Sequence, residues 1–286
     1  MNLIAIILAL LTEHFYKPIV QWRNYQWFTQ YEQWVYQKLE GYSFREGPVA
    51  VILIFGIIVC LVWIIAAALY NLFGLLGFLF ATAMLIYCIG PTDLDEDVQA
   101  YLADIENDDA EGANHKAENI LGYTVSDEPS VVANKVKEAI FIQGNNRMLG
   151  VVCWFVLLGP AGALLFRLSE IHSRTCKVEN SGYADACKRL FYILSWLPAR
   201  LSVLGYAIVG NFVDTMSKWQ GFSDIWQADN DELVIASGLG ALKHDEDEAK
   251  DEVDVPGVLD VLALVKRTLV FWLAVLAIFT LTGVLI

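Results

Sequence analysis

Long uncharged apolar stretches alternate with polar segments along this chain. Four of the stretches contain no charged residue: 47–70, 71–91, 148–166 and 268–286. A helix needs about 20 apolar residues to cross the roughly 30 Å hydrocarbon core of a bilayer. The pattern therefore predicts four transmembrane helices in an all-α, polytopic helical membrane protein.

A further apolar stretch, LFYILSWLPARLSVLGYAIVGNF (190–212), is interrupted near its middle by Pro198 and Arg200. Proline removes a backbone donor and frees the carbonyl one turn earlier, around Leu194. A charge at bilayer depth is costly and usually faces protein, water or a ligand. We expect this stretch to form a fifth, interrupted transmembrane helix, which gives four to five in all.

The N-terminal region is shorter and more polar. Residues 1–11 are apolar but lack the basic start and the small-residue cleavage site of a signal peptide, so we expect a short anchored or re-entrant helix. Residues 12–47 are rich in Trp and Tyr with interspersed Lys and Arg. This composition is typical of a helix lying on the membrane interface, and we expect one such helix ended by Gly41.

Two polar segments, 92–146 and 213–267, are predicted to be soluble helical insertions. The first shows the pattern of two or three short amphipathic helices, and the second is expected to begin with a short helix and to be disordered over 243–257. The predicted parts of the chain are a short helix with an interfacial helix (1–47), a transmembrane hairpin (48–91), an acidic insertion (92–146), a glycine-rich transmembrane stretch with a basic loop and the Pro/Arg-containing stretch (147–212), a second acidic insertion (213–267) and a C-terminal transmembrane helix (268–286).

Composition supports a membrane protein with acidic loops. The chain is 56% hydrophobic and 18% charged, with a net charge of −14. Acidic surfaces repel nucleic acid, so the expected partner is the lipid bilayer. Basic residues near the predicted transmembrane ends are balanced between the two sides, so they do not decide orientation. Cys176 and Cys187 share one short loop, and whether they pair depends on the compartment that the loop faces.

Common catalytic signatures are missing from the sequence. It contains no P-loop, no G-x-S-x-G and no H-E-x-x-H motif, and no catalytic residue is assigned. The run DLDED places Asp93, Asp95 and Asp97 together after an apolar stretch. Carboxylates suit Mg²⁺ or Ca²⁺, but they equally suit the first turn of a helix, so these are weak metal candidates and the expectation is no metal.

Two motifs within the apolar stretches are unusual. LLGPAGALLFRL (157–168) gathers small residues around Pro160, which favours close helix packing or an opened polar contact. SWLPARL (195–201) carries Arg200, whose five donors need carbonyls, a carboxylate or a phosphate, in a structural or a ligand-binding role. We expect the two motifs to meet in one polar pocket at membrane depth. The candidate ligand-binding residues are Arg200, Pro198, Gly159, Gly162, Asn145, Asn146 and Glu138.

Three stretches resemble a known family: NRMLGVVCWFVLLGPAGALLFRLSE, LSWLPARLSVLGYAIVGNF and IGPTDLDEDVQAYL. They resemble the AmpE family of Gram-negative inner-membrane proteins over nearly the whole chain. The resemblance implies a multi-pass protein of the bacterial inner membrane that senses or modulates cell-wall recycling and β-lactamase induction. It also implies partner proteins of those pathways and, by analogy, a cytoplasmic location of 92–146.

That family is in turn similar to the CobD/CbiB membrane enzymes, which attach an aminopropanol unit to a corrinoid carboxylate. The shared elements are Pro198 to Leu201 and Gly159 to Leu165, and Glu138 is the one family acid that has a counterpart. The chain differs where the enzymes carry other acids, having IQGNNR (142–147) and LFYIL (190–194) there. The alternative function is therefore an ATP-dependent, Mg²⁺-using ligase or transferase acting on a carboxylate. A transporter or channel is a weaker hypothesis, because no inverted repeat is evident.

Overall fold

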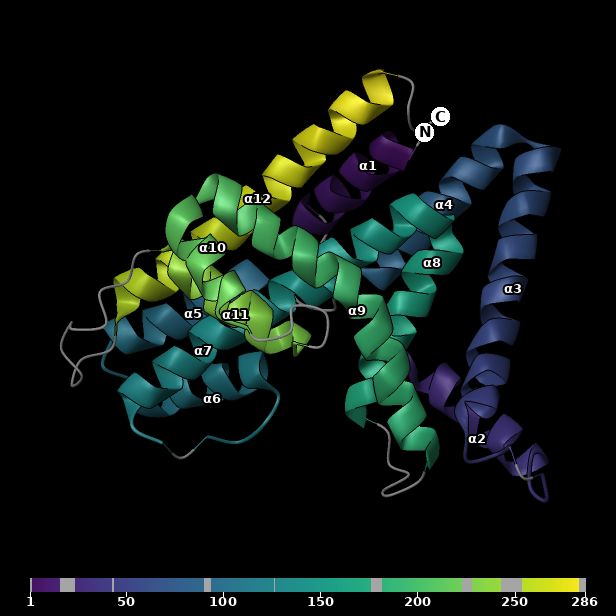
Figure 1. Ribbon diagram of the computed structural model, residues 1–286, viewed down its shortest axis with the longest axis horizontal. Helices are drawn as coiled ribbons and strands as arrows, with labels where there is room; N and C mark the ends of the chain where they lie inside the picture. Colours follow the sequence, from purple (N-terminus) through teal and green to yellow (C-terminus); the bar gives the residue numbers. More distant parts are fainter. Residues whose placement is uncertain are drawn as a thin grey trace. The chain divides into compact units, whose positions relative to one another are not determined.

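The computed structural model describes residues 2–15, 24–42, 44–89, 94–125, 127–175, 182–222, 228–242 and 254–282. Over these residues the secondary structure is helical, without a strand, as the apolar pattern predicted (Figure 1). The elements are α1 (Asn2–Phe15), α2 (Gln26–Lys38), α3 (Pro48–Leu72), α4 (Gly74–Cys88), α5 (Leu94–Glu106), α6 (Ala110–Leu121), α7 (Pro129–Gln143), the π-helix η2 (Gly144–Leu149), α8 (Gly150–Thr175), α9 (Gly182–Val209), α10 (Phe212–Gln220), α11 (Asn230–Ala241) and α12 (Val255–Leu281).

The chain folds into two compact units, each built from separate sequence segments. Unit 1 comprises Met1–Pro91 and Gly150–Leu197, and unit 2 comprises Thr92–Leu149 and Pro198–Leu285.

Among the described residues, four helical segments are long and apolar enough to cross a membrane. They are Pro48–Leu72, Pro129–Arg174, Gly182–Val209 and Val255–Leu281. The protein is therefore a polytopic helical membrane protein, and the interrupted stretch with Pro198 and Arg200 lies within one of these segments.

The hairpin of α3 and α4 in unit 1 is asymmetric (Figure 1). The two helices meet at Phe73, whose extended backbone ends one helix and begins the other. α3 has 25 residues, but α4 ends at Cys88 after 15 residues, a length of about 22 Å. The stretch predicted as the second transmembrane helix therefore forms an apolar helix, as expected, but this helix is shorter than the bilayer core.

The N-terminal region also differs from the prediction of one interfacial helix over 12–47. α1 ends at Phe15, Asn24 and Tyr25 are not helical, and α2 begins at Gln26, so the segment contains a break. α2 ends at Lys38, and Gly41 follows with a left-handed φ of 95°. The predicted glycine stop therefore acts just beyond the helix end.

Within α8, the glycine-rich turn is a kink. Gly159 has φ 68° and ψ −155°, a conformation open almost only to glycine, directly before Pro160. The bend brings Gly162 against the preceding turns: a Cβ at Gly162 would lie 2.4 Å from the backbone oxygen of Trp154. Both glycines are therefore required by the backbone path.

Pro198 leaves the Leu194 carbonyl without its usual helical donor, as predicted. The indole Nε1 of Trp154 donates to this carbonyl at 2.9 Å. A tryptophan from α8 thus satisfies the backbone group that the proline of α9 releases.

Replacing Trp154 with Phe is expected to lower the melting temperature in detergent by several degrees. The change keeps most of the aromatic packing but leaves the Leu194 carbonyl unpaired, which costs about 1–3 kcal/mol. Trp63→Phe is the matched control, because Trp63 is 64% exposed on α3. Equal melting temperatures for the two variants would contradict the role of Trp154.

The core of unit 2 joins the two predicted insertions. α5 packs on α6, α6 on α7, and α7 also contacts α11 and α12. Shared buried residues include Val98, Ile120, Val136, Ile140, Val234 and Val261. Acidic residues end up capping helices: the side chains of Asp109, Asp229 and Asp254 accept backbone N–H groups at the starts of α6, α11 and α12.

The last helix begins earlier than predicted. α12 is continuous from Val255, whereas the sequence placed residues up to 267 in a soluble insertion. Its first half packs into the unit 2 core through Val258, Val261 and Val265, and its second half exposes Val270 and Ile278. The predicted disorder over 243–257 falls mostly on residues outside the described ranges, and the described part, Asp254–Gly257, caps and starts α12.

Candidate functional site

A π-helix carries two of the predicted site residues in unit 2. Asn145 and Asn146 lie on η2 with side chains 1% and 0% exposed. The Nδ2 of Asn145 donates to Asn146 Oδ1 at 2.9 Å, and Ser202 Oγ donates to Asn145 Oδ1 at 2.8 Å. We call these three residues the η2 polar network. π-helical turns disturb the regular backbone pairing and frequently mark functional sites.

The π-helix lies close to α12 because residue 144 is a glycine. A Cβ at Gly144 would approach a methyl group of Val265 to 2.4 Å. The close approach brings α12 beside the η2 polar network.

Arg200 is buried and held by α11. Its side chain is 6% exposed, and its Nη1 donates to Oδ1 of Asn230, which is itself 4% exposed. The acceptor is a neutral amide, and this bond fixes the orientation of the guanidinium. Sequence reasoning missed Asn230; the available signal was the run ADND, in which Asp229 caps α11.

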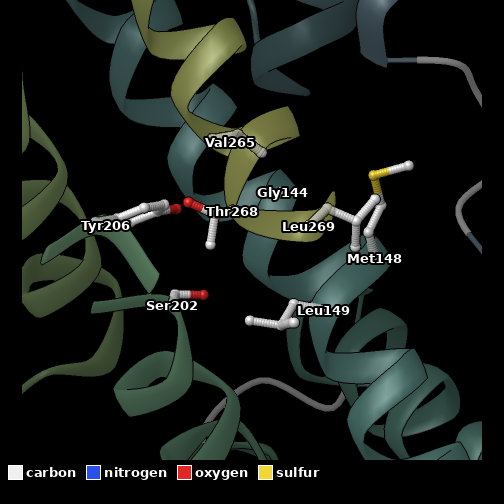
Figure 2. A pocket seen from close by; sticks show the side chains of 8 residues that line it. All are labelled: Gly144, Met148, Leu149, Ser202, Tyr206, Val265, Thr268 and Leu269. Atoms are coloured by element: carbon white, nitrogen blue, oxygen red, sulfur yellow. The ribbon is translucent and has the colours of Figure 1, made fainter. Parts of the chain in front are cut away.

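A small cavity of about 10 Å³ adjoins the η2 polar network (Figure 2). Three hydroxyl-bearing side chains line it: Ser202 and Tyr206 on α9 and Thr268 on α12. The remaining wall is formed by Gly144, Met148, Leu149, Val265 and Leu269.

The remaining residues of the predicted pocket do not all lie beside the η2 polar network. Glu138 is exposed on α7, whereas Asn145 and Asn146 are buried. Gly159 and Gly162 belong to unit 1, so their predicted meeting with Arg200 stays a prediction. Pro198 precedes Arg200 on α9 and shapes the helix.

The described part of the acidic run forms an ion pair with α12. Asp95 lies 2.5 Å from Nζ of Lys266, and Asp97 lies in the first turn of α5, while Asp93 is outside the described ranges. Among the described residues, no group of three or more His, Cys, Asp or Glu side chains is placed to hold a metal. Cys176 lies outside the described ranges, so the structure does not test whether Cys176 and Cys187 pair.

A second cavity, of about 200 Å³, lies among α5, α6 and α7. Tyr101 forms part of its wall, and burial raises the pKa of Tyr101 to about 12. Asp108 and Asn114 also line this cavity.

Unit 1 contains a buried charged cluster that sequence reasoning also missed. Arg167 and Glu170 on α8 pair at 2.5 Å with both side chains at least 94% buried, and Arg174 Nε lies 3.3 Å from the same carboxylate. His172 of α8 lies 2.6 Å from Glu32 of α2, and both side chains are buried. The signal was the run FRLSEIHSR, which places Arg167 and Arg174 three and four positions from Glu170 at the end of an apolar helix.

The helical segments and the buried polar groups define a multi-pass α-helical membrane protein whose helices carry buried polar side chains. A family model described as CobD/Cbib protein matches residues 3–245. The chain therefore belongs to the CobD/Cbib protein family.

Two curated relatives are similar to parts of the chain. Cobalamin biosynthesis protein CobD of Stutzerimonas stutzeri (strain A1501) is 26% identical over 182 residues, which cover 62% of this chain and 59% of that protein. Cobalamin biosynthesis protein CobD of Chromobacterium violaceum is 31% identical over 142 residues, covering 46% of this chain and 45% of that protein. The chain thus matches about half the length of these relatives. No solved structure matches it.

These matches correct the resemblance to AmpE. The family model and both named relatives point to CobD proteins, so the assignment to AmpE, and with it the role in β-lactamase induction, is wrong. Two of the motifs behind that assignment, Pro198 to Leu201 and the glycine-rich turn, occur in both families. Shared motifs of this kind do not discriminate between related families.

Proposed function

We propose that this protein acts in cobalamin biosynthesis as an inner-membrane enzyme that binds a carboxylate-bearing substrate and joins it to an amine through an amide bond. The observation that carries the proposal is the family match over residues 3–245, which includes η2 and the Pro-Ala-Arg-Leu element. The names of the two relatives support the same pathway.

In this proposal, Arg200 binds the substrate carboxylate. A guanidinium pairs with a carboxylate through two parallel N–H groups, and its geometry has to be fixed for that purpose. The bond to Asn230 supplies this support, because it holds one arm of the fork in place. The η2 polar network offers amide groups that orient a polar substrate near the same helix, α9.

The ATP and Mg²⁺ that such a ligase implies are only partly matched by the described residues. The buried polar side chains at this site are a guanidinium, amides and hydroxyls, which suit an anion. Protein sites for a divalent cation usually include at least one carboxylate, and the described residues of this site contribute none. We therefore assign Arg200 to anion binding and derive no step through a metal.

The test is growth that depends on cobalamin, in a bacterial strain lacking its own CobD protein. The wild-type chain is expected to restore growth, Arg200→Gln to fail, and Arg200→Lys to restore it weakly, because lysine keeps the charge and loses the fork. Arg189→Gln is the matched control, since Arg189 is exposed on the same helix.

Folding is followed separately by the yield of monodisperse protein in detergent. Wild-type protein that is folded but does not restore growth would overturn the proposed function. Folded Arg200→Gln that supports growth as well as wild type would overturn the role of Arg200.

A further inference from the structure

Thr268 on α12 has a buried hydroxyl that, unlike two threonines at the end of this helix, forms no hydrogen bond to the preceding turn. Thr280 and Thr282 donate to the carbonyls of Leu276 and Ile278 four residues earlier, at 2.8 and 3.0 Å. Thr268 is 4% exposed, yet among the residues that the structure describes its Oγ1 has no hydrogen-bond partner. Burying a hydroxyl without a hydrogen bond is costly, so we expect this hydroxyl to have a hydrogen-bond partner that the described residues do not supply.

The packing explains why the hydroxyl turns away from its own helix. A Cβ at Gly205 would lie only 2.4 Å from Cγ2 of Thr268, so the threonine methyl occupies the space that the glycine leaves on α9. Because the methyl group faces Gly205, the hydroxyl of Thr268 points away from Gly205. Figure 2 shows the hydroxyl-bearing ends of Thr268 and Tyr206 turned toward each other at the edge of the small cavity.

The cavity has the size and the lining of a site for one water molecule. Its volume of about 10 Å³ is close to the least that a buried water occupies, and such waters make two to four hydrogen bonds. Ser202 Oγ gives its proton to Asn145, so toward the cavity it offers a lone pair. Tyr206 and Thr268 each offer a donor or an acceptor. A water can thus donate to Ser202 and to one of these hydroxyls, and accept from the other.

We propose that the cavity beside η2 binds a single ordered water, held by Thr268, Ser202 and Tyr206. Through Ser202 the water connects α12 to the η2 polar network, so Thr268 is a positioning residue for the π-helix. Thr268 lies beyond residue 245, where the family match ends. The inference is independent of the substrate proposed above, because it concerns only the packing of unit 2.

The test is Thr268→Val, a change of similar shape that removes the hydroxyl. If the cavity holds water, the variant loses a partner for it, and we expect a melting temperature several degrees lower. We also expect at least tenfold faster hydrogen exchange at the backbone amides of Asn145–Leu149. If the cavity is dry, the variant instead removes a buried unpaired group, and the melting temperature rises. An unchanged or raised melting temperature therefore overturns the proposal.

Two further variants keep the test decisive if Thr268→Val folds poorly. Thr268→Ser keeps the hydroxyl and is expected to preserve slow exchange in η2, whereas exchange as fast as in Thr268→Val would overturn the water. Ser202→Ala combined with Thr268→Val should cost less than the sum of the two single changes, because both remove the same water; additive effects would contradict the shared site. Thr280→Val is the control on the same helix, and its exchange in η2 should match wild type.

Discussion

Glu170→Leu is expected to lower the melting temperature of the detergent-solubilised protein by on the order of 10 °C, the largest stability effect that we predict. Glu170 neutralises Arg167, and both side chains are at least 94% buried. Removing one partner of a buried ion pair leaves an uncompensated charge, which costs about 3–5 kcal/mol. The measurement is thermal unfolding followed by intrinsic tryptophan fluorescence.

A double substitution separates the stranded charge from lost packing. Arg167→Met combined with Glu170→Leu should recover most of the lost stability, because neither charge then remains in the interior. The exposed pair of Lys135 with Asp127 supplies a control, and Asp127→Ala should leave the melting temperature unchanged. A single variant Glu170→Leu as stable as wild type would show that the pair does not form in the folded protein.

Gly159→Ala is expected to have the second largest effect, through the backbone rather than through charge. At φ 68° and ψ −155°, a side chain is strained by about 1–3 kcal/mol, and the kink of α8 depends on this residue. We therefore expect a melting temperature lower by several degrees and a reduced yield of monodisperse protein. Gly162→Ala should act in the same direction, because its Cβ would meet the Trp154 oxygen at 2.4 Å.

Gly56→Ala is the matched control for these two changes. Gly56 lies within α3, where a Cβ would meet no atom within 4 Å, and alanine favours a helix over glycine. Its melting temperature should equal or exceed that of wild type. If Gly159→Ala behaves like Gly56→Ala, the kink does not need a left-handed backbone at residue 159.

Local chemistry explains which parts of the fold were predictable. The uncharged stretch at 48–72 was predictable as a helix, because a continuous apolar segment of this length in a bilayer pairs its backbone groups within itself. The freed carbonyl of Leu194 followed from the covalent structure of Pro198 alone. Its donor, Trp154, could not be predicted, because it lies forty residues earlier and nothing local links the two.

The candidate site was predictable to the same limited extent. Arg200, Asn145 and Asn146 were conspicuous as polar groups within or next to apolar stretches, and all three are buried. Asn230 lies in an acidic segment whose composition predicts solvated surface. Its contact with Arg200 depends on how α11 packs. Predicting such a partner requires knowing the tertiary fold first.

The discontinuous sequence of unit 2 imposes an order on its biogenesis. The apolar face of α7, with Val136 and Ile140, is covered in part by α12, which is synthesised more than a hundred residues later. At translation rates of about 5–20 residues per second, that face waits on the order of ten seconds for its partner. During this interval the apolar face of α7 remains exposed to the membrane insertion machinery. In nascent chains stalled before Val255, α7 should therefore be sensitive to protease. In chains stalled after α12 has emerged from the ribosome, α7 should be protected.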